Sequence, residues 1–123
     1  MQEKSTTTRS AGQAGEQLAV DYLIARGFAL LGRNYRTKFG EIDIIAKRKG
    51  VVYFIEVKAR GWGSLIDPLE AVTPAKAKRL RRVAEHYLLK NPRIERMPCS
   101  FAVIGIDHTV MPPHIECVLD AFE

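Results

Sequence analysis

The feature that most constrains the fold is residues 40–60, where two apolar runs flank a short charged turn. Residues 42–46 and 51–55 are rich in β-branched and aromatic side chains, and the segment between them ends in Gly50. Two runs of this kind around a short turn that contains glycine are typical of a β-hairpin. We therefore expect two antiparallel strands at the centre of the fold.

The charged residues of this hairpin are predicted to share one face of the sheet. A two-residue turn places Asp43 directly opposite Glu56, and a four-residue turn makes them diagonal neighbours on the same face. Lys58 points the same way as Glu56 because side chains alternate along a strand. Either register therefore brings Asp43, Glu56 and Lys58 together.

Two carboxylates on adjacent strands repel each other unless a cation lies between them. Mg²⁺ is held by one or two carboxylates, with water and substrate phosphate in its other coordination positions. One interpretation is therefore a metal site formed by Asp43 and Glu56. The alternative is a surface hairpin in which Glu41 and Lys58 form an ordinary cross-strand charge pair. The hairpin pattern leaves both interpretations open.

The sequence around these acids resembles a known family. Gly-Glu-Ile-Asp-Ile-Ile-Ala at residues 40–46 and Phe-Ile-Glu-Val-Lys-Ala-Arg at residues 54–60 are similar to segments of the YraN-like family of small bacterial proteins. Members of that family are predicted endonucleases similar to archaeal Holliday junction resolvases. The shorter Asp…Glu-x-Lys pattern of Asp43, Glu56 and Lys58 resembles the core of the restriction-endonuclease-like nucleases.

This resemblance implies a restriction-endonuclease-like fold, an α/β fold in which helices flank a mixed β-sheet. It also implies an endonuclease that uses Mg²⁺ or Mn²⁺ to hydrolyse DNA, with branched and RNA-containing strands among its candidate substrates and a homodimer as a candidate assembly. Asp43 and Glu56 would bind the metal, with Glu16 in or near its coordination sphere. Lys58 would orient the attacking water or stabilise the developing negative charge.

The predicted role of Glu16 has a simpler alternative. The apolar pattern predicts a helix over residues 14–26, and Glu16 lies at the edge of its apolar stripe. An acidic residue in the first turn of a helix commonly interacts with the helix dipole alone. The resemblance instead implies that the Glu16 side chain reaches the metal, and we expect it near Asp43 and Glu56.

A second charged region is strongly basic. Thr73 and Pro74 are typical of a helix start, as N-cap and first helical residue, and an apolar stripe follows over residues 74–90. The rest of this helix carries almost one sign of charge, which supplies few stabilising ion pairs and favours a polyanionic partner. Its charged residues are Lys76, Lys78, Arg79, Arg81, Arg82, Glu85 and Lys90.

Contacts with nucleic acid are expected from this helix and from the turn before the hairpin. Arg79 and Arg82 are predicted to contact a phosphate backbone. Arg36 and Lys38 are predicted to do the same, or to be ordinary solvated turn charges. Lys76 matches the lysine of the family's Val-Thr-x-x-Lys segment, and the resemblance brings it toward the active site.

One position departs from the family pattern. The family usually has Phe-Asp at the start of its fourth strand, where this chain has Phe101-Ala102. Loss of that carboxylate supports a second hypothesis, a nucleic-acid-binding module with a vestigial nuclease site. A third hypothesis is an interaction protein whose basic helix binds an acidic partner.

The remaining pattern completes the predicted α/β fold, in the order helix, three strands, helix, two strands. Residues 61–73 show no periodic element, and Trp62 within them either stacks on nucleic acid or pins the loop to the core. The further strands are predicted over residues 28–36, 99–106 and 114–119.

Size and composition limit the other classes. The 123 residues suit one domain with a single core, and we expect a disordered polar tail at residues 1–10 and the nuclease-like domain at residues 11–123. No stretch approaches the ~20 apolar residues of a membrane span. Cys99 and Cys117 lack the spacing of metal ligands, which favours reduced, partly buried thiols in a cytoplasmic protein.

Overall fold

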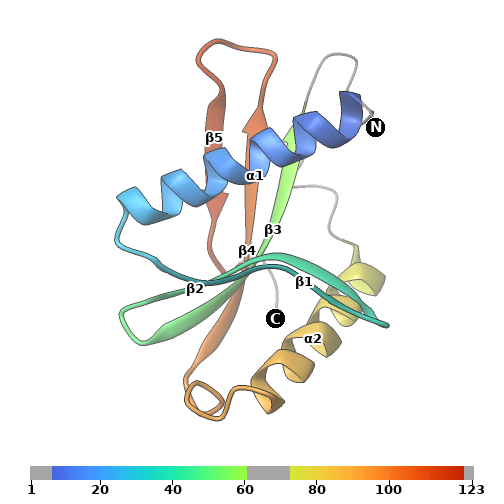
Figure 1. The fold of residues 1–123 in the computed structure, drawn as a ribbon, viewed down its shortest axis with the longest axis vertical. Helices are drawn as coiled ribbons and strands as arrows, with labels where there is room; N and C mark the ends of the chain where they lie inside the picture. Colours follow the sequence, from blue (N-terminus) through green and yellow to red (C-terminus); the bar gives the residue numbers. More distant parts are fainter. Residues whose placement is uncertain (1–6, 61–72, 121–123) are drawn as a thin grey trace.

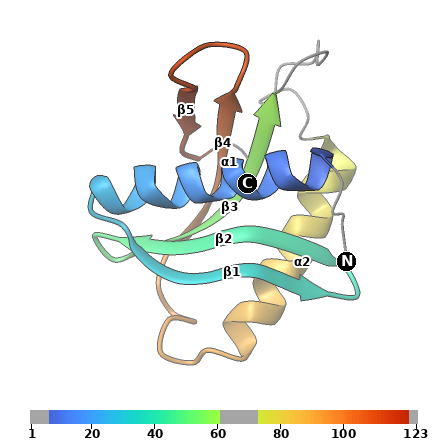
Figure 2. The same cartoon turned by 45° about the horizontal axis from the view of Figure 1, so that its top comes forward.

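The computed structural model describes the backbone of residues 7–60 and 73–120, with side chains over residues 14–59 and 73–120. Its two helices and five strands follow the predicted order, and one helix covers each face of a single mixed sheet (Figures 1 and 2). The predicted α/β class is therefore confirmed. The elements are α1 (Thr7–Ala25), β1 (Ala29–Thr37), β2 (Gly40–Arg48), β3 (Val51–Arg60), α2 (Pro74–Leu89), β4 (Cys99–Asp107) and β5 (His114–Val118).

The sheet has the strand order β1-β2-β3-β4-β5. Strands β3 and β4 run parallel, and all other neighbours run antiparallel. A parallel pair needs a crossover connection, and α2 lies in the segment that makes it. The crossover carries the basic helix from one end of β3 back across the sheet.

The central hairpin forms with the two-residue turn. Lys49 and Gly50 both have positive φ, at 51° and 79°, as a type I′ turn requires. The resulting register pairs Ile44 with Ile55, so the alternative four-residue turn is wrong. This pair is the last in the ladder between β2 and β3, and Asp43 lies just beyond it.

Two apolar clusters fill the space between the sheet and the helices. In the first cluster α1 packs Ala19 and Leu23 against strand residues such as Ile104. In the second cluster α2 packs Leu80 and Val83 against the other face of the sheet. Each helix therefore has its own core, and the sheet separates them.

Alternation along β3 decides which cluster each of its residues joins. Ile55 belongs to the α1 cluster, whereas Phe54 belongs to the α2 cluster. Glu56 is two residues after Phe54, so it lies on the α2 side of the sheet. The strand period thus directs an acidic side chain toward the basic helix.

The start of α1 differs from the prediction. The helix begins at Thr7 rather than at residue 14, so residues 7–10, which the composition placed in the tail, are helical. The segment before residue 14 is rich in polar and small residues and offers no apolar stripe from which a helical period is readable.

Trp62 and the rest of residues 61–72 lie outside the described residues. Within the described part, neither helix is long and apolar enough to cross a membrane.

The two cysteines are free thiols. Cys117 is half-buried as predicted, and burial raises the pKa of its thiol. Cys99 is exposed, so the expectation that both are partly buried is wrong for this residue. It occupies the first position of β4, where the strand has only begun to enter the core.

Candidate active site

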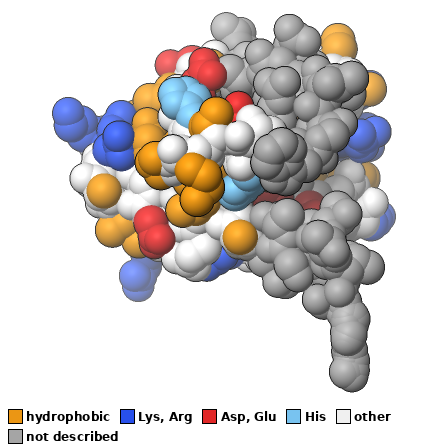
Figure 3. All heavy atoms as spheres, turned by 90° about the horizontal axis from the view of Figure 1, so that it is seen from above, with side chains coloured by type: hydrophobic (Ala, Val, Ile, Leu, Met, Phe, Trp, Pro, Cys, Tyr) orange, Lys and Arg blue, Asp and Glu red, His pale blue; other side chains and the backbone are white. Residues whose placement is uncertain are grey.

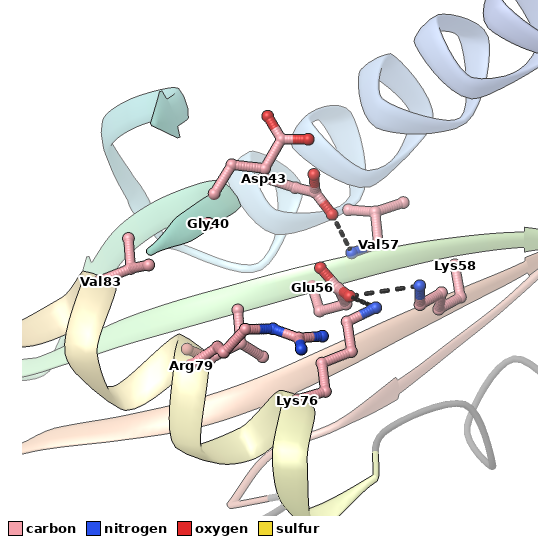
Figure 4. Close-up of a pocket in the computed structure, with 10 residues that line it drawn as sticks. Gly40, Asp43, Glu56, Val57, Lys58, Lys76, Arg79 and Val83 are labelled. Carbon is pink, nitrogen blue, oxygen red and sulfur yellow. Dashed lines mark hydrogen bonds and ion pairs between the residues drawn. The ribbon is translucent and has the colours of Figure 1, made fainter. Parts of the chain in front are cut away.

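A pocket of about 320 Å³ opens where β2 and β3 part, between the sheet and the first half of α2 (Figure 4). Three elements supply its charged lining. The irregularity in β2, the alternation of side chains along β3 and the helical spacing of α2 each direct charged side chains into the pocket. The charged residues that line it are Glu41, Asp43, Glu56, Lys58, Lys76 and Arg79.

Asp43 sits at an irregularity in β2. Ile42 packs in the α2 cluster and Ile44 in the α1 cluster, although residues two apart in a regular strand share a face. The backbone amide of Val57 donates to Asp43 Oδ2 at 2.8 Å. The carboxylate thus takes the place of the backbone carbonyl of β2 that this amide would otherwise need as its acceptor. The side chain of Asp43 is therefore fixed against β3 at the mouth of the pocket.

Glu56 is the one buried charged side chain in the described part of the protein, at 7% exposure. Its Oε2 lies 3.3 Å from Lys58 Nζ and also accepts a hydrogen bond from Lys76 Nζ. A buried carboxylate requires such partners because desolvation otherwise disfavours its charge. Figure 4 shows both lysine side chains converging on it, with Arg79 alongside.

The two carboxylates have opposite pKa shifts. Burial raises the pKa of Asp43 to about 7; the hydrogen bond from Val57 opposes this shift, and the negative charges of Glu56 and Glu16 add to it. Burial also acts to raise the pKa of Glu56, but the Lys76 hydrogen bond and the charge of Lys58 hold it below its usual value. Neighbouring acids whose environments separate their pKa values are typical of functional sites.

The two lysines also differ. Burial acts to lower the pKa of Lys58, but its contacts with Lys76, Glu56 and Asp43 raise it above the usual value. Burial lowers the pKa of Lys76, and the adjacent Lys58 reinforces this effect against the opposing contact with Glu56. The pKa values of the two lysines are therefore shifted in opposite directions.

Glu16 lies beside this pocket rather than in its lining. Its Oε1 is 3.9 Å from an Arg33 guanidinium nitrogen. The side-chain amide of Asn34 faces the same carboxylate, and once it is flipped so that its donors meet these acceptors, its nitrogen donates to Oε1 and Oε2 at 3.1 and 3.3 Å. Its charge reaches Asp43, whose pKa it raises. Among the described residues, however, no three acidic, histidine or cysteine side chains are close enough to hold one metal ion.

Asn34 is a site residue that sequence reasoning missed. The register pairs Arg33 with Ile44 and Tyr35 with Ile42, so Asn34 lies across from Asp43. It has a positive φ of 53°, a conformation that asparagine tolerates better than most residues. The sequence signal that could have indicated Asn34 is an asparagine within a run that otherwise resembles a strand, because asparagine is depleted in regular strands.

The basic residues predicted to bind nucleic acid fall into three places. Lys76 and Arg79 line the pocket itself. Lys38 and Arg82 line a second hollow next to it, which Arg79 also borders. Arg36 is set apart, since its Nε donates to Glu41 Oε2 at 2.8 Å.

The alternative of a simple charge pair between Glu41 and Lys58 is wrong. Glu41 pairs with Arg36 on β1, and Lys58 pairs with Glu56 on its own strand. The parting of β2 from β3 beyond Ile44 removes the register on which that cross-strand pair depended.

Ala102 lies on the opposite side of the sheet from this pocket. It is 1% exposed, belongs to the α1 cluster and pairs with Ile55. Glu56 points the other way, toward α2. The missing carboxylate therefore leaves the polar lining of the pocket intact and places a methyl group in the apolar core.

A family profile described as "Uncharacterised protein family UPF0102" matches residues 15–106, which run from α1 to β4 and include every charged residue of the pocket. The chain belongs to this family. A UPF0102 protein of Nitrosococcus oceani is 41% identical over 119 residues, covering 97% of this chain and 96% of that protein. One from Geotalea uraniireducens is 39% identical over 98% of this chain and 95% of its own length. One from Symbiobacterium thermophilum is 44% identical over 81% of this chain and 84% of its own. The YraN-like relationship predicted from the hairpin sequence is therefore confirmed.

Proposed function

We propose that this UPF0102 protein is a metal-dependent endonuclease that hydrolyses phosphodiester bonds in DNA. The observation that carries the proposal is a single pocket in which the carboxylates of Asp43 and Glu56, on adjacent strands, lie with three cationic side chains, while Glu41 also lines it. Carboxylates suit a divalent cation, and the cations suit the phosphate that such an ion would bind. The residues concerned are Asp43, Glu56, Lys58, Lys76 and Arg79.

The carboxylate pair fits Mg²⁺ or Mn²⁺. Mg²⁺ needs only one or two protein carboxylates when water and substrate phosphate complete its coordination. Burial, together with the negative charges of Glu56 and Glu16, raises the pKa of Asp43, and a divalent ion held by Asp43 and Glu56 would favour its charged form. Glu16 would act from just outside, through its charge on Asp43 or through bound water.

When bound, the ion would polarise a phosphoryl oxygen and lower the pKa of the attacking water. Lys58, held next to Glu56, would hydrogen-bond that water or stabilise the negative charge that develops on the phosphate. Arg79 and Lys76 project from α2 into the same pocket and would neutralise the non-bridging phosphate oxygens (Figure 4). α2 would therefore hold the substrate against the acids of the sheet.

A second candidate is a nucleic-acid-binding module with a vestigial nuclease site. It is favoured by the two lysine contacts that Glu56 already makes, because a metal has to compete with them. It is also favoured because, among the described residues, no three acidic, histidine or cysteine side chains are grouped closely enough to hold a metal ion. Both candidates use the basic face of α2, so binding alone does not separate them.

The test is cleavage of linear, single-stranded, flapped and four-way DNA, together with RNA, in Mg²⁺ or Mn²⁺. Asp43→Asn and Glu56→Gln should each reduce cleavage at least roughly a hundredfold, since even partners of metal ligands cost 10–100-fold when removed. Both variants should bind DNA in EDTA as tightly as wild type or more tightly, because each removes negative charge near the phosphate.

Asp21→Asn and Glu116→Gln are matched controls, since both residues are exposed and lie outside the pocket lining. They should cut like wild type. Substantial cutting by both pocket variants would refute the catalytic assignment. DNA binding without cleavage in either metal would select the vestigial module, and the absence of both would reject the two candidates together.

A further inference from the structure

Beside the active-site pocket lies a second hollow of about 340 Å³, within the roughly 300–1,000 Å³ of typical ligand sites. One aromatic ring and four cationic side chains line it, and no carboxylate is among them. Arg79 borders both cavities, so the hollow continues the active-site pocket along α2. Its lining residues are Lys38, Phe39, Lys78, Arg79 and Arg82.

The ring of Phe39 is held in place by the turn between β1 and β2. The Phe39 amide donates to Thr37 Oγ1 at 3.0 Å, and the ring packs half-buried against the α2 cluster. Gly40 follows with a φ of 143°, a backbone conformation that residues with a side chain rarely adopt, and the place of its absent Cβ is in ordinary van der Waals contact with Val83 Cγ2 on α2, at 3.8 Å. A side chain at residue 40 is therefore disfavoured, and the turn stays close to the helix.

Two of the cations lie near this ring. Lys38 Nζ is 5.4 Å and the Arg82 guanidinium carbon 5.3 Å from the ring centroid, within the range of a cation–π contact. Lys78 and Arg82 are four residues apart on α2, and like charges at that spacing destabilise a helix. Within the described residues, none of the four cations of the hollow forms an ion pair with a carboxylate.

This concentration of positive charge is local. Viewed at the end of the molecule that carries the β4–β5 connection, hydrophobic and histidine side chains occupy the middle of the described surface, with lysine and arginine toward its margins (Figure 3). Val110 and Met111 are exposed in that connection. The basic hollow is thus a feature of the α2 side and not a consequence of a uniformly basic surface.

We propose that the hollow is a nucleotide subsite, in which an unpaired base of the DNA stacks on Phe39 while its flanking phosphates contact Lys38, Arg82 and Arg79. This inference rests on the proposed function, because Arg79 joins the subsite to the phosphate position of the active site. A base inside a duplex has both faces covered by its neighbours, so only an unpaired base can stack on a side chain. The substrate class is therefore a strand with unpaired bases beside the cleaved bond, such as a single strand, a flap or a branch point.

Binding measured in EDTA tests the subsite without cleavage. Phe39→Leu keeps the apolar packing but removes the ring, and should weaken binding of single-stranded DNA about tenfold. Binding of a duplex of the same sequence should change less than about twofold. The slope of log K against log salt should stay the same, because no phosphate contact is lost. Phe39→Tyr keeps the ring and should bind as wild type does.

Tyr22→Leu is the matched control. Tyr22 is a half-buried aromatic residue with the Arg26 guanidinium 3.5 Å from its ring centroid, but it lies on α1, on the other face of the sheet. Its loss should lower the melting temperature without changing the preference for single strands. A Phe39→Leu protein that binds single strands as tightly as wild type, or loses single strands and duplex equally, overturns the subsite; Phe39 then only packs the turn against α2.

The outcomes separate this inference from the endonuclease proposal. Wild type that binds and cuts DNA, with no effect of Phe39→Leu on binding, overturns the subsite alone. A selective loss of single-strand binding in a protein that never cuts supports the subsite and overturns the nuclease. Wild type that binds no DNA overturns both. An RNA strand of the same sequence that binds more tightly than DNA and loses as much on Phe39→Leu overturns the assignment to DNA.

Discussion

The two faces of the sheet are covered by helices of similar length, yet among the described residues the buried charge lies on one face alone. α1 packs Ala19 and Leu23 on an apolar cluster that contains no buried charge. α2 packs Leu80 and Val83 on a second cluster, and one turn earlier it sets Lys76 over Glu56. A sheet that buries both faces can therefore stabilise the fold through one helix and use the end of the other to assemble reactive groups.

Leu23→Ala should produce the largest change in stability. Leu23 is 2% exposed in the α1 cluster, and truncating a buried leucine costs about 2–5 kcal/mol of unfolding free energy. Urea denaturation measures this loss. The stabilisation by Mn²⁺ should stay as large as in wild type, because the site lies on the other face. Loss of the Mn²⁺ effect in a folded Leu23→Ala protein would show that the two faces are not independent.

Asp43→Asn should have opposite effects with and without metal. In EDTA the variant should melt higher than wild type, since it removes the repulsion between Asp43 and Glu56, which Lys58 offsets only in part. A cation that binds only the folded site stabilises by about 2.7 kcal/mol at a hundredfold excess over Kd, on the order of 10 °C for a domain of this size. In saturating Mn²⁺ the variant should therefore melt lower than wild type. Equal Mn²⁺ shifts in the two proteins, or none in either, would mean that these acids form no metal site.

Metal-free stability should fall as pH rises toward neutrality. The pKa of Asp43 is raised from 3.8 to about 7, so between these values the folded protein holds a proton that the unfolded chain has released. Stability should drop by on the order of 1–2 kcal/mol between pH 5 and 7, after allowance for partial exposure. Glu56, whose pKa is lowered, acts with the opposite sign, and its effect is lost only as the pH falls below the usual glutamate pKa of 4.5.

Urea midpoints at pH 5, 6 and 7 in EDTA measure this slope. Asp43→Asn should remove it, and the histidines, present in both proteins, cancel in the difference between them. Saturating Mn²⁺ should reverse the slope in wild type, because a metal ligand must be deprotonated to bind. If stability changes with pH equally in the wild type and in Asp43→Asn in EDTA, the group that binds the proton is not Asp43.

The smallest expected effect concerns the arginines of α2 that line the two hollows. Replacing Arg79 and Arg82 with glutamine should weaken DNA binding across all sequences and flatten the slope of log K against log salt by about one unit per lost phosphate contact. Arg26→Gln with Arg48→Gln is the control, since these side chains stack on Tyr22 and Phe28 on the α1 side. Equal salt slopes for the two double variants would exclude α2 from the binding surface.

Several features follow from contiguous residues and were predictable from them. The apolar runs on either side of Lys49-Gly50 determine the hairpin and its register, because the turn accepts positive φ and the strand period aligns the rest. Thr73 caps α2 by accepting a hydrogen bond from the Lys76 amide at 3.1 Å, and Pro74 begins the helix. The start of α1 was not predictable, because its first residues have no apolar stripe to bury.

The arrangement of the site depends on segments that only tertiary structure brings together. Lys76 meets Glu56 because α2 crosses back over the sheet, and no spacing along the chain encodes that contact; the family resemblance alone suggested it. The raised pKa of Asp43 needs burial and the nearby charges of Glu56 and Glu16, and no sequence pattern states either of them. Phe39 joins Arg82 because a β-turn and a helix, far apart in the chain, pack on one cluster. Strand alternation and helix capping are local, so the sequence determined which residues share a face, except at the irregularity in β2 between Ile42 and Ile44. Desolvation and contact between distant elements are not local, so the tertiary structure decided which of those residues form a site.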